Sequence, residues 1–435
     1  MNIVMVGTGY VGLISGLCFA EFGFNVTCVD KDNNRIKKLN QGIMPIYEPG
    51  LDELFAKHHK DTKRIKLETD ICKSLSNADA VFITVGTPSR RIDDDADLTA
   101  VYAVAEEISH NIKKYCLVVT KSTVPVGTTR KIKEIIQKKV SSSMFDVASN
   151  PEFLREGSAI NDFMRPDRVI IGIESGKAEK ILNTLYKPLY ILETPIFTTN
   201  IETAELIKYA SNSFLATKIS FINEVADLCE KVGANIQDVS KGMGLDKRIG
   251  SKFLHAGPGF GGSCFPKDVQ AFSNTAKKND VKLSIVDSVN EFNKQRPKIL
   301  AKKIKKYFSN NITNHKFALL GLSFKPNTDD IRDSTSIIIG NELLQSGAKI
   351  IAFDPKAMKN SHYENPKFEY GTDVYNTCKN VDAIIIGTEW NEFRALDLQK
   401  LKTLVNKAII FDLRNLYNQD ELINIGWEHI SIGRK

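Results

Sequence analysis

Residues 2–30 form the stretch NIVMVGTGYVGLISGLCFAEFGFNVTCVD, which decides the fold. An apolar segment leads into the glycine turn Gly7-x-Gly9-x-x-Gly12, a helical pattern follows, and a second apolar segment ends at Asp30. Strand, glycine turn, helix, strand and acid, in that order, are the fingerprint of a dinucleotide-binding unit. We therefore predict a Rossmann-like domain at the start of the chain.

Each residue of this stretch has a separate physical task. Gly7 allows the tight turn, Gly9 lets the backbone approach a pyrophosphate, and Gly12 lets the helix pack closely on the strand. Asp30 would accept hydrogen bonds from the adenosine ribose and repel a 2′-phosphate, so the sequence favours NAD over NADP. Arg35 would touch the ribose or phosphate, or it is simply an exposed helix residue.

Hydroxyl residues follow two further apolar strands of the first half, at 78–88 and 115–127. Ligands of a doubly wound sheet gather beyond the carboxyl ends of its strands. Thr84, Thr87 and Thr123 are therefore candidates to line the cofactor, although each hydroxyl could equally cap a helix.

The second half of the chain repeats the pattern. Residues 316–355 are again ordered as strand, loop, helix, strand and acid, and further apolar strands follow. The loop that starts with GLSFKPNTDD (321–330) lacks the full glycine fingerprint and offers Lys325 and Arg332 instead. We infer a second doubly wound unit that binds a different anionic ligand.

A helical region separates the two units. Residues 202–233 keep apolar side chains at intervals of three and four, and 281–308 show a second helical pattern that Pro297 would break or kink. A long connecting helix would bury its apolar face against both halves or against a second subunit, which would suit a homo-oligomer. We expect an α/β protein of two doubly wound Rossmann-like domains, 1–198 and 299–435, joined by a central helical domain, 199–298.

The composition excludes several classes of protein. The 435 residues are 42% hydrophobic and 26% charged, as in globular proteins, and no apolar run is long enough to span a membrane. The N-terminus lacks the features of a signal peptide. The formal net charge is +7, but the basic runs at 131–139 and 302–308 have helical spacing. We therefore expect solvated helix faces there and no nucleic-acid-binding surface.

The seven cysteines are widely spaced and include no C-x-x-C pair. We therefore expect neither a disulfide framework nor a structural zinc site, and a reducing cytoplasm fits best. The histidines form no ligand cluster, so we predict no metal site. Five cysteines lie among apolar neighbours and are expected to be small core residues: Cys18, Cys28, Cys72, Cys116 and Cys229.

Cys264 differs, because it lies in the glycine-rich loop GFGGSCFPKD (259–268). A cation such as Lys267 stabilises a nearby thiolate, and Asp268 would orient Lys267 or a water molecule. A thiolate adds to an aldehyde, the adduct loses a hydride, and water cleaves the resulting thioester. An NAD site beside such a cysteine therefore indicates oxidation past the aldehyde to the acid. The alternative is a structural loop with an incidental thiol.

Two further stretches carry pairs of polar residues at helical spacing. In SNPEFLREGSAIND (149–162), Glu152 and Glu156 would fall on one helical face, as acid and base or as hydrogen-bond acceptors at a helix start. In 202–233, Lys208 and Asn212 share a face with apolar residues. Such a lysine either extends to water or is a desolvated catalytic amine.

Taken in order, these motifs resemble those of the nucleotide-sugar dehydrogenases, and most closely the branch that oxidises UDP-glucose. The resemblance implies NAD-dependent four-electron oxidation of UDP-glucose to UDP-glucuronate. Sister enzymes that oxidise GDP-mannose or UDP-N-acetyl-hexosamines share the thiol and the helix, and a two-electron hydroxyacid-type dehydrogenase is a more distant alternative. The matching stretches run from end to end: MVGTGYVGL, PIYEPGL, KSTVPVGTT, NPEFLREGSAIND, AELIKYASNSFLA, KRIGSKFLHAGPGFGGSCFPKD and GLSFKPNTDDIRDS.

The resemblance also implies roles for the catalytic residues. Cys264 would be the nucleophile. Lys208 and Asn212 would hold the reacting end of the substrate, with Lys208 stabilising an oxyanion or accepting a proton. Asp268 and Thr123 would position and activate the hydrolytic water. Glu152, which would lie near that water or the substrate, completes the implied catalytic set.

By the same resemblance, the cofactor would contact Gly7, Gly9, Tyr10, Val11, Gly12, Asp30, Arg35, Thr87, Thr123, Glu156, Lys267 and Arg332. The substrate would contact Glu152, Phe153, Leu154, Lys208, Asn212, Arg248, Phe253, Leu254, His255, Ala256, Gly257, Gly261, Lys325 and Arg414. Arg248 resembles an arginine that family members extend across a dimer interface. The implied partners are UDP-glucose and a second copy of the chain, with no nucleic acid and no membrane.

Overall fold

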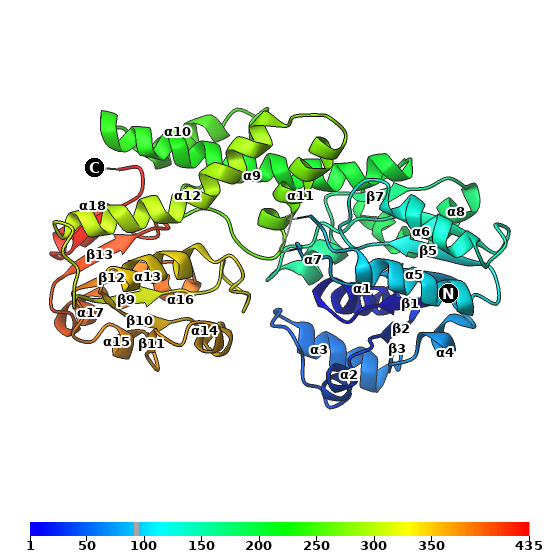
Figure 1. Cartoon of the computed structure of the whole chain (residues 1–435). Helices are drawn as coiled ribbons and strands as arrows, with labels where there is room; N and C mark the ends of the chain where they lie inside the picture. The colour runs from blue at the N-terminus through cyan, green and yellow to red at the C-terminus, as the bar shows by residue number, and fades with distance from the viewer. Residues whose placement is uncertain (91–94, 435) are drawn as a thin grey trace. The chain divides into compact units, whose positions relative to one another are not determined.

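The computed structural model describes residues 1–90 and 95–434, in two compact units (Figure 1). The first unit consists of Met1–Ser211 and Asn274–Val281, and the second of Asn212–Ser273 and Lys282–Lys435. Each unit contains one sheet with helices packed on it, so the prediction of two doubly wound α/β domains is confirmed.

The sheet of the first unit has eight strands in the order β3-β2-β1-β4-β5-β6-β7-β8. Its first six strands have the order of a Rossmann sheet and are parallel, whereas β7 meets β6 in the antiparallel direction. The strands are β1 Asn2–Val6, β2 Asn25–Val29, β3 Ile65–Glu68, β4 Ala80–Ile83, β5 Cys116–Thr120, β6 Phe145–Ser149, β7 Val169–Gly172 and β8 Ile196–Thr199.

Both faces of this sheet are buried. On β1, Ile3 and Met5 belong to one apolar core, and Val4 and Val6 belong to another on the opposite face. Covered faces explain why the strands are continuously apolar. The helices are α1 Tyr10–Glu21, α2 Asn33–Asn40, α3 Leu51–Ala56, η1 Lys57–Asp61, α4 Ile71–Leu75, α5 Thr99–Asn111, α6 Thr128–Gln137, α7 Ala159–Met164, α8 Gly176–Tyr186 and η2 Lys187–Leu192.

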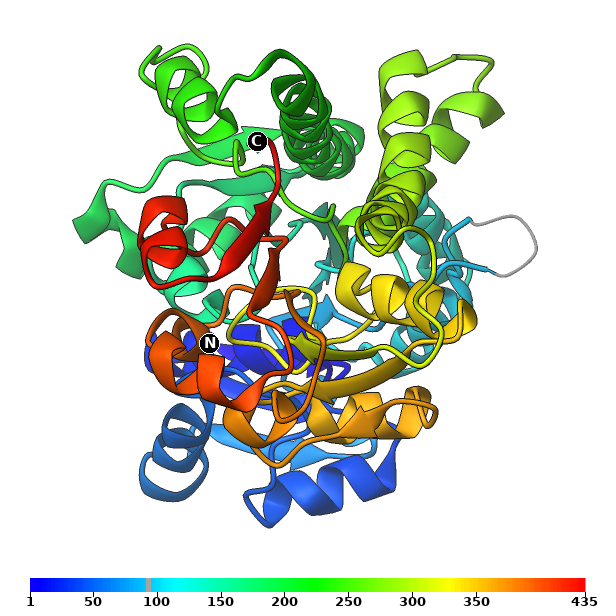
Figure 2. The same ribbon diagram turned by 90° about the vertical axis from the view of Figure 1, so that its left-hand side faces the viewer.

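The sheet of the second unit is entirely parallel, with six strands in the order β11-β10-β9-β12-β13-β14. These strands are drawn in yellow to red in Figure 1 and Figure 2. Phe317 and Leu319 of β9 face one core, and Ala318 and Leu320 face the other. The strands are β9 Lys316–Leu320, β10 Lys349–Phe353, β11 Glu369–Tyr370, β12 Ala383–Ile386, β13 Ile409–Asp412 and β14 Glu428–Ser431. The helices among them are α13 Thr335–Gln345, α14 Met358–Glu364, α15 Val374–Thr377, α16 Asn391–Arg394, α17 Leu398–Leu404 and α18 Gln419–Asn424.

Along the chain, long helices lie between the last strand of the first sheet and the first strand of the second. Helix α9, Ile201–Val232, begins in the first unit and ends in the second, and α12, Ser284–Tyr307, continues through Pro297 without a break. Two shorter helices, α10 Ile236–Gly244 and α11 Phe265–Lys278, lie between them in the chain. Among the described residues, no helix combines the length and apolar character that crossing a bilayer requires.

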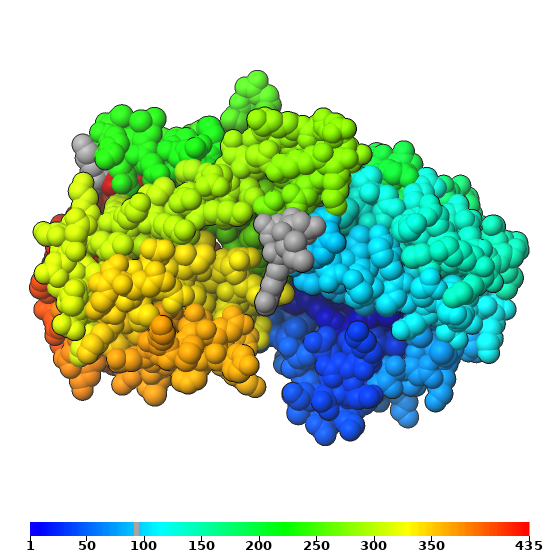
Figure 3. Space-filling view, in the orientation of Figure 1, coloured from blue at the N-terminus to red at the C-terminus, as the bar shows by residue number. Residues whose placement is uncertain are grey.

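The basic runs are solvated helix faces, as predicted. On α12, Lys302 and Lys306 are exposed while Ile304 is buried, and side chains of this helix form part of the surface in Figure 3, where they are yellow-green. The run at 131–139, which covers most of α6 and the two residues after it, likewise has buried isoleucines between exposed charged residues.

One prediction about the cysteines is wrong. Cys72 is exposed in the first turn of α4, where its backbone N–H donates to the capping carboxylate of Asp70. Its neighbour Ile71 faces the core, and consecutive helical residues point in different directions, so apolar neighbours did not imply burial. The other four predicted core cysteines are buried: Cys18, Cys28, Cys116 and Cys229.

Candidate active site

The predicted site residues fall in both compact units. The first unit holds the glycine turn, Asp30, Arg35, the three predicted threonines, the segment with Glu152 and Glu156, and Lys208. The second unit holds Asn212, Arg248, residues 253–261, Cys264, Lys267, Asp268, Lys325, Arg332 and Arg414.

The glycine turn has the tight geometry that its sequence predicts. Gly7 has a φ of +107°, which L side chains rarely adopt, and a Cβ on Gly12 would stand 1.9 Å from the carbonyl oxygen of Gly7. A Cβ on Gly9 would meet nothing within 4 Å, so the backbone there is open to a ligand. The buried hydroxyl of Thr84 donates to the carbonyls of Val6 and Gly7, so this threonine fastens the turn itself.

Asp30 lies directly after β2 and faces the turn. Its carboxylate accepts from the Thr8 backbone N–H at 2.9 Å, the Thr8 hydroxyl at 2.7 Å and the Asp32 N–H at 3.0 Å. Partial burial opposes ionisation, but the bonds from Asp32 and Thr8 hold the pKa of Asp30 below its usual range. Arg35 Nη1 lies 3.5 Å from this carboxylate on a partly exposed side chain, so Arg35 is close to the predicted ribose site.

Thr87 and Thr123, two of the three predicted threonines, lie together. The hydroxyl of Thr87 donates to the carbonyl oxygen of Thr123 at 2.9 Å. Neither residue caps a helix, since α5 begins at Thr99 and α6 at Thr128. This contact joins the segments that follow β4 and β5, at the edge of the sheet where ligands of doubly wound folds gather.

The prediction that Glu152 and Glu156 share a helical face is wrong. The segment before α7, which begins at Ala159, has no regular structure. The Leu154 N–H donates to the Glu152 carboxylate and the Arg155 N–H to Asp162, so side chains take the place of helical acceptors.

Glu152 nevertheless meets another predicted residue. Its Oε1 lies 3.2 Å from Lys208 Nζ, and the two side chains are 5% and 4% exposed. The Lys208 ammonium also lies 5.1 Å from the centre of the Phe153 ring. Of the two alternatives for Lys208, the structure excludes extension to water and leaves a desolvated amine held by a buried carboxylate.

A second buried lysine near this pair was missed by sequence reasoning. Lys121 Nζ lies 3.1 Å from Asn150 Oδ1 and 3.3 Å from the Tyr186 hydroxyl. Burial lowers the pKa of Lys121 to about 8, against the opposing attraction of the Glu152 carboxylate, and the charge of Lys208 lowers it further. The sequence did contain a signal for this burial: Lys121, the first residue of KSTVPVGTT, directly follows an apolar strand.

In the second unit, Cys264 is half-buried and immediately precedes α11. The free N–H groups at a helix N-terminus favour an anion such as a thiolate. One turn into α11, the fully buried Asp268 accepts from Asn212 Nδ2 at 2.7 Å and pairs with Lys267 Nζ at 2.7 Å. The structure therefore brings four predicted residues, Cys264, Lys267, Asp268 and Asn212, to one place.

The predicted substrate loop 253–261 is held by polar side chains of the long helices. Asn293 accepts from the Phe260 N–H and donates to the Phe260 carbonyl, both at 2.9 Å. Asn223 accepts from the Gly257 N–H at 2.8 Å, and the buried Arg296 donates to the Gly257 carbonyl. These bonds fix the backbone of a segment that has no regular structure.

The remaining predicted residues include several arginines. Arg414 donates to the carbonyls of Gly387 and Phe324 and lies beside Gly257, so it adjoins the substrate loop. Lys325 lies over the Phe324 ring, and Arg332 pairs with Asp330 on an exposed side chain. Arg248 is 89% exposed and pairs with Asp246, apart from these groups. Within the loop, Leu254 and Ala256 are buried and His255 is exposed.

The carboxylate directly after the second strand of the second unit, Asp354, is fully hydrogen-bonded within that unit. Asp354 follows β10 as Asp30 follows β2, but it is 1% exposed and accepts from the Leu322 and Ser323 N–H groups and from Trp390. A carboxylate so enclosed has no free face for ribose hydroxyls. This difference fits the prediction that the second unit takes a different ligand.

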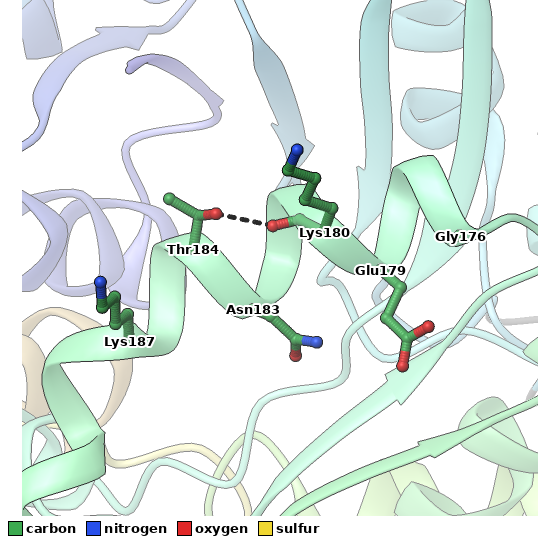
Figure 4. Close-up of a pocket in the computed structure, with 6 residues that line it drawn as sticks. All are labelled: Gly176, Glu179, Lys180, Asn183, Thr184 and Lys187. Atoms are coloured by element: carbon green, nitrogen blue, oxygen red, sulfur yellow. Dashed lines mark hydrogen bonds between the residues drawn. The ribbon is translucent and has the colours of Figure 1, made fainter.

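A hollow of about 520 Å³ lies along α8 and the start of η2 (Figure 4). It contains no predicted site residue and its lining comes from one helical segment, so we do not include it in the candidate site. The lining residues are Gly176, Glu179, Lys180, Asn183, Thr184 and Lys187.

Comparison with known proteins covers nearly the whole chain. Three models of the UDP-glucose/GDP-mannose dehydrogenase family match: the NAD binding domain at residues 1–190, the central domain at 202–295 and the UDP binding domain at 318–419. The chain is 49% identical over 436 residues to the UDP-glucose 6-dehydrogenase of Rhizobium meliloti (strain 1021), with 100% of both chains covered. It is 48% identical over 437 residues to that of Rickettsia bellii (strain RML369-C), again with 100% coverage of both.

A solved structure agrees with these matches. The UDP-glucose dehydrogenase from the hyperthermophilic archaeon Pyrobaculum islandicum superposes with a TM-score of 0.92 at 34% identity. The superposition covers 100% of this chain and 98% of that one.

Proposed function

The chain belongs to the UDP-glucose/GDP-mannose dehydrogenase family, and from that membership we propose that it oxidises UDP-glucose to UDP-glucuronate. It is an NAD-dependent oxidoreductase with an NAD-binding and a UDP-binding domain. Curated relatives named UDP-glucose 6-dehydrogenase at 45–49% identity over the full chain favour UDP-glucose over other nucleotide sugars. The three-part division into 1–198, 199–298 and 299–435 is part of this proposal.

The residues of the first unit fit a dinucleotide. The open backbone at Gly9, the free N-terminus of α1 and the ionised carboxylate of Asp30 would hold its pyrophosphate and ribose. When bound, NAD supplies the hydride acceptor for both oxidations. Thr87, Thr123 and Glu156 would line the rest of its site.

The observation that carries the four-electron reaction is the half-buried thiol at the N-terminus of α11 beside a buried carboxylate. Cys264, as a thiolate, would add to the aldehyde carbon, forming a carbon–sulfur bond and an alkoxide. Lys208 and Asn212, one turn apart on α9, would hold that oxygen. After the second oxidation, Asp268 would take a proton from water, and the hydroxide would displace the thiolate to release the acid.

We further propose a homo-oligomer, in which α9 supplies the contact. Phe214, Phe221 and Leu228 recur at intervals of seven on α9 and are 65%, 49% and 59% exposed. Intervals of seven place side chains on one helical stripe, and a second copy would cover it. The exposed Arg248 would reach the partner's substrate. A cytoplasmic location is consistent with seven free cysteines.

The test is to count the NADH formed per sugar. Pure protein is mixed with excess NAD and limiting UDP-glucose, GDP-mannose or UDP-N-acetylglucosamine in parallel. We expect about two NADH per UDP-glucose and much less turnover of the other two sugars. One NADH per sugar would indicate a two-electron dehydrogenase, and preference for another sugar would move the chain to a sister activity.

A further inference from the structure

The stretch PIYEPGL (45–51) carries a glutamate that the proposed reaction does not use. Glu48 lies in the segment between α2 and α3, yet it is only 3% exposed. One of its oxygens accepts from the Ala159 N–H at 2.7 Å. The other accepts from the Gly157 N–H at 2.6 Å and from the Tyr10 hydroxyl. A buried carboxylate is stable only with such donors, so its position is closely specified.

The groups that meet at Glu48 come from two parts of the candidate site. Tyr10 is the first residue of α1 and lies inside the glycine turn, between Gly9 and Gly12. Its hydroxyl also accepts from the Gly157 N–H at 3.1 Å. Burial, followed by the bond to Glu48, raises the pKa of Tyr10 above its usual range, so the hydroxyl keeps its proton and donates.

The other partners border the segment that presents both candidate acids. Gly157 directly follows Glu156, and Ala159 is the first residue of α7. Residues 151–157 lie outside helices and strands, so side-chain bonds, together with a turn bond from the Ser158 N–H to the Arg155 carbonyl, set the shape of this segment. Glu48 holds its C-terminal end, while the ion pair of Lys208 with Glu152 holds its N-terminal end.

We propose that Glu48 is a positioning residue that ties the cofactor turn, through Tyr10, to the segment carrying Glu152 and Glu156. The placement of the two acids relative to the cofactor turn then depends on one carboxylate. This inference rests on the proposed function for its kinetic consequence, but the physical link itself can be measured without substrate.

The test compares Glu48→Gln with Glu53→Gln, a matched control on the exposed face of α3. An amide keeps the size of the carboxylate but has only one accepting atom, so at least one donor at this site loses its acceptor. We expect kcat with UDP-glucose to fall at least about tenfold, while the Kd for NAD changes less than about threefold. Hydrogen exchange of a peptide covering 151–160 should be at least about tenfold faster, and the control should match the wild type.

Several outcomes would overturn the link. The link is wrong if Glu48→Gln has the same hydrogen exchange at 151–160 and the same kcat as the wild type. It is also wrong if kcat and NAD affinity fall in parallel, because that would indicate general damage to the domain. If Glu48→Gln does not fold, Tyr10→Phe decides, because it leaves the carboxylate and both backbone donors in place. Faster exchange at 151–160 in that variant supports the link, and unchanged exchange refutes it.

The two proposals fail separately. If the wild type does not oxidise UDP-glucose, the proposed function is wrong, yet exchange at 151–160 still decides the role of Glu48. In the double variant Tyr10→Phe/Glu48→Gln, the gain in exchange should be less than the sum of the two single gains, because both changes remove the same connection. Full additivity would contradict a shared link.

Discussion

The surroundings of Lys121 predict how the free energy of unfolding changes with pH. Its ammonium is fully buried with two neutral partners, Asn150 and Tyr186, and burial lowers its pKa from 10.5 to about 8. Between these values the unfolded chain binds more protons at this site than the folded chain does. The free energy of unfolding contributed by Lys121 therefore rises with pH.

The size of the effect follows from the shift. The full difference, 10.5 minus about 8, costs the folded state about 3 kcal/mol below pH 8. Between pH 7 and pH 9 the cost is relieved by about 1.3 kcal/mol. Other groups act in the opposite direction: burial raises the pKa of the Cys28 thiol to about 12, for example. Only the difference in the free energy of unfolding between the wild type and Lys121→Met, taken at each pH, isolates the contribution of the lysine.

The assay is urea unfolding at pH 7, 8 and 9, followed by circular dichroism and by tryptophan fluorescence. Both tryptophans, Trp390 and Trp427, lie in the second unit, so fluorescence identifies the transition of that unit and circular dichroism reports both. Relative to Lys121→Met, the wild-type first unit should gain about 1.3 kcal/mol from pH 7 to 9. The exposed Lys138→Met is the control and should show no such change. A pH-independent difference for Lys121→Met would refute the reasoning.

Three further predictions concern the candidate site. Cys264→Ser should stop the reaction before free acid forms, as judged by chromatography of the products, and normal yield of UDP-glucuronate would remove the thiol mechanism. Lys208→Ala should lower kcat roughly 100-fold while the Kd for NAD stays nearly constant, since the oxygen that Lys208 would hold becomes an alkoxide only during the reaction; equal losses in both would contradict its placement. Asn293→Ala leaves the Phe260 N–H and carbonyl without their partner, which costs about 1–3 kcal/mol for each buried group. We expect a raised KM for UDP-glucose measured at saturating NAD, and an unchanged KM would show that the loop keeps its shape without that clamp.

Features encoded by neighbouring residues were predictable. The glycine turn follows from sterics within a few residues, as the 1.9 Å approach at Gly12 shows. Lys208 and Asn212 share a helical face because residues four apart in a helix always do. The continuous apolar runs of β1 and β9 likewise predict sheets buried on both sides.

The failures have a common cause. Glu152 and Glu156 have helical spacing, but side-chain hydrogen bonds take the place of helical ones. Cys72 has apolar neighbours, but it lies on the outer side of α4. In both cases local pattern alone left two conformations open, and contacts elsewhere selected one.

The sequence by itself determined two doubly wound units and the choice of cofactor, and it marked Cys264 as the candidate nucleophile, because each of these depends on residues adjacent in the chain. Tertiary structure alone decided that Lys208 is desolvated against Glu152, that Lys121 is buried beside neutral partners, and that Glu48 joins the cofactor turn to residues more than a hundred positions away. The physical reason is that burial and charge pairing depend on which distant segments meet. Only folding brings those segments together.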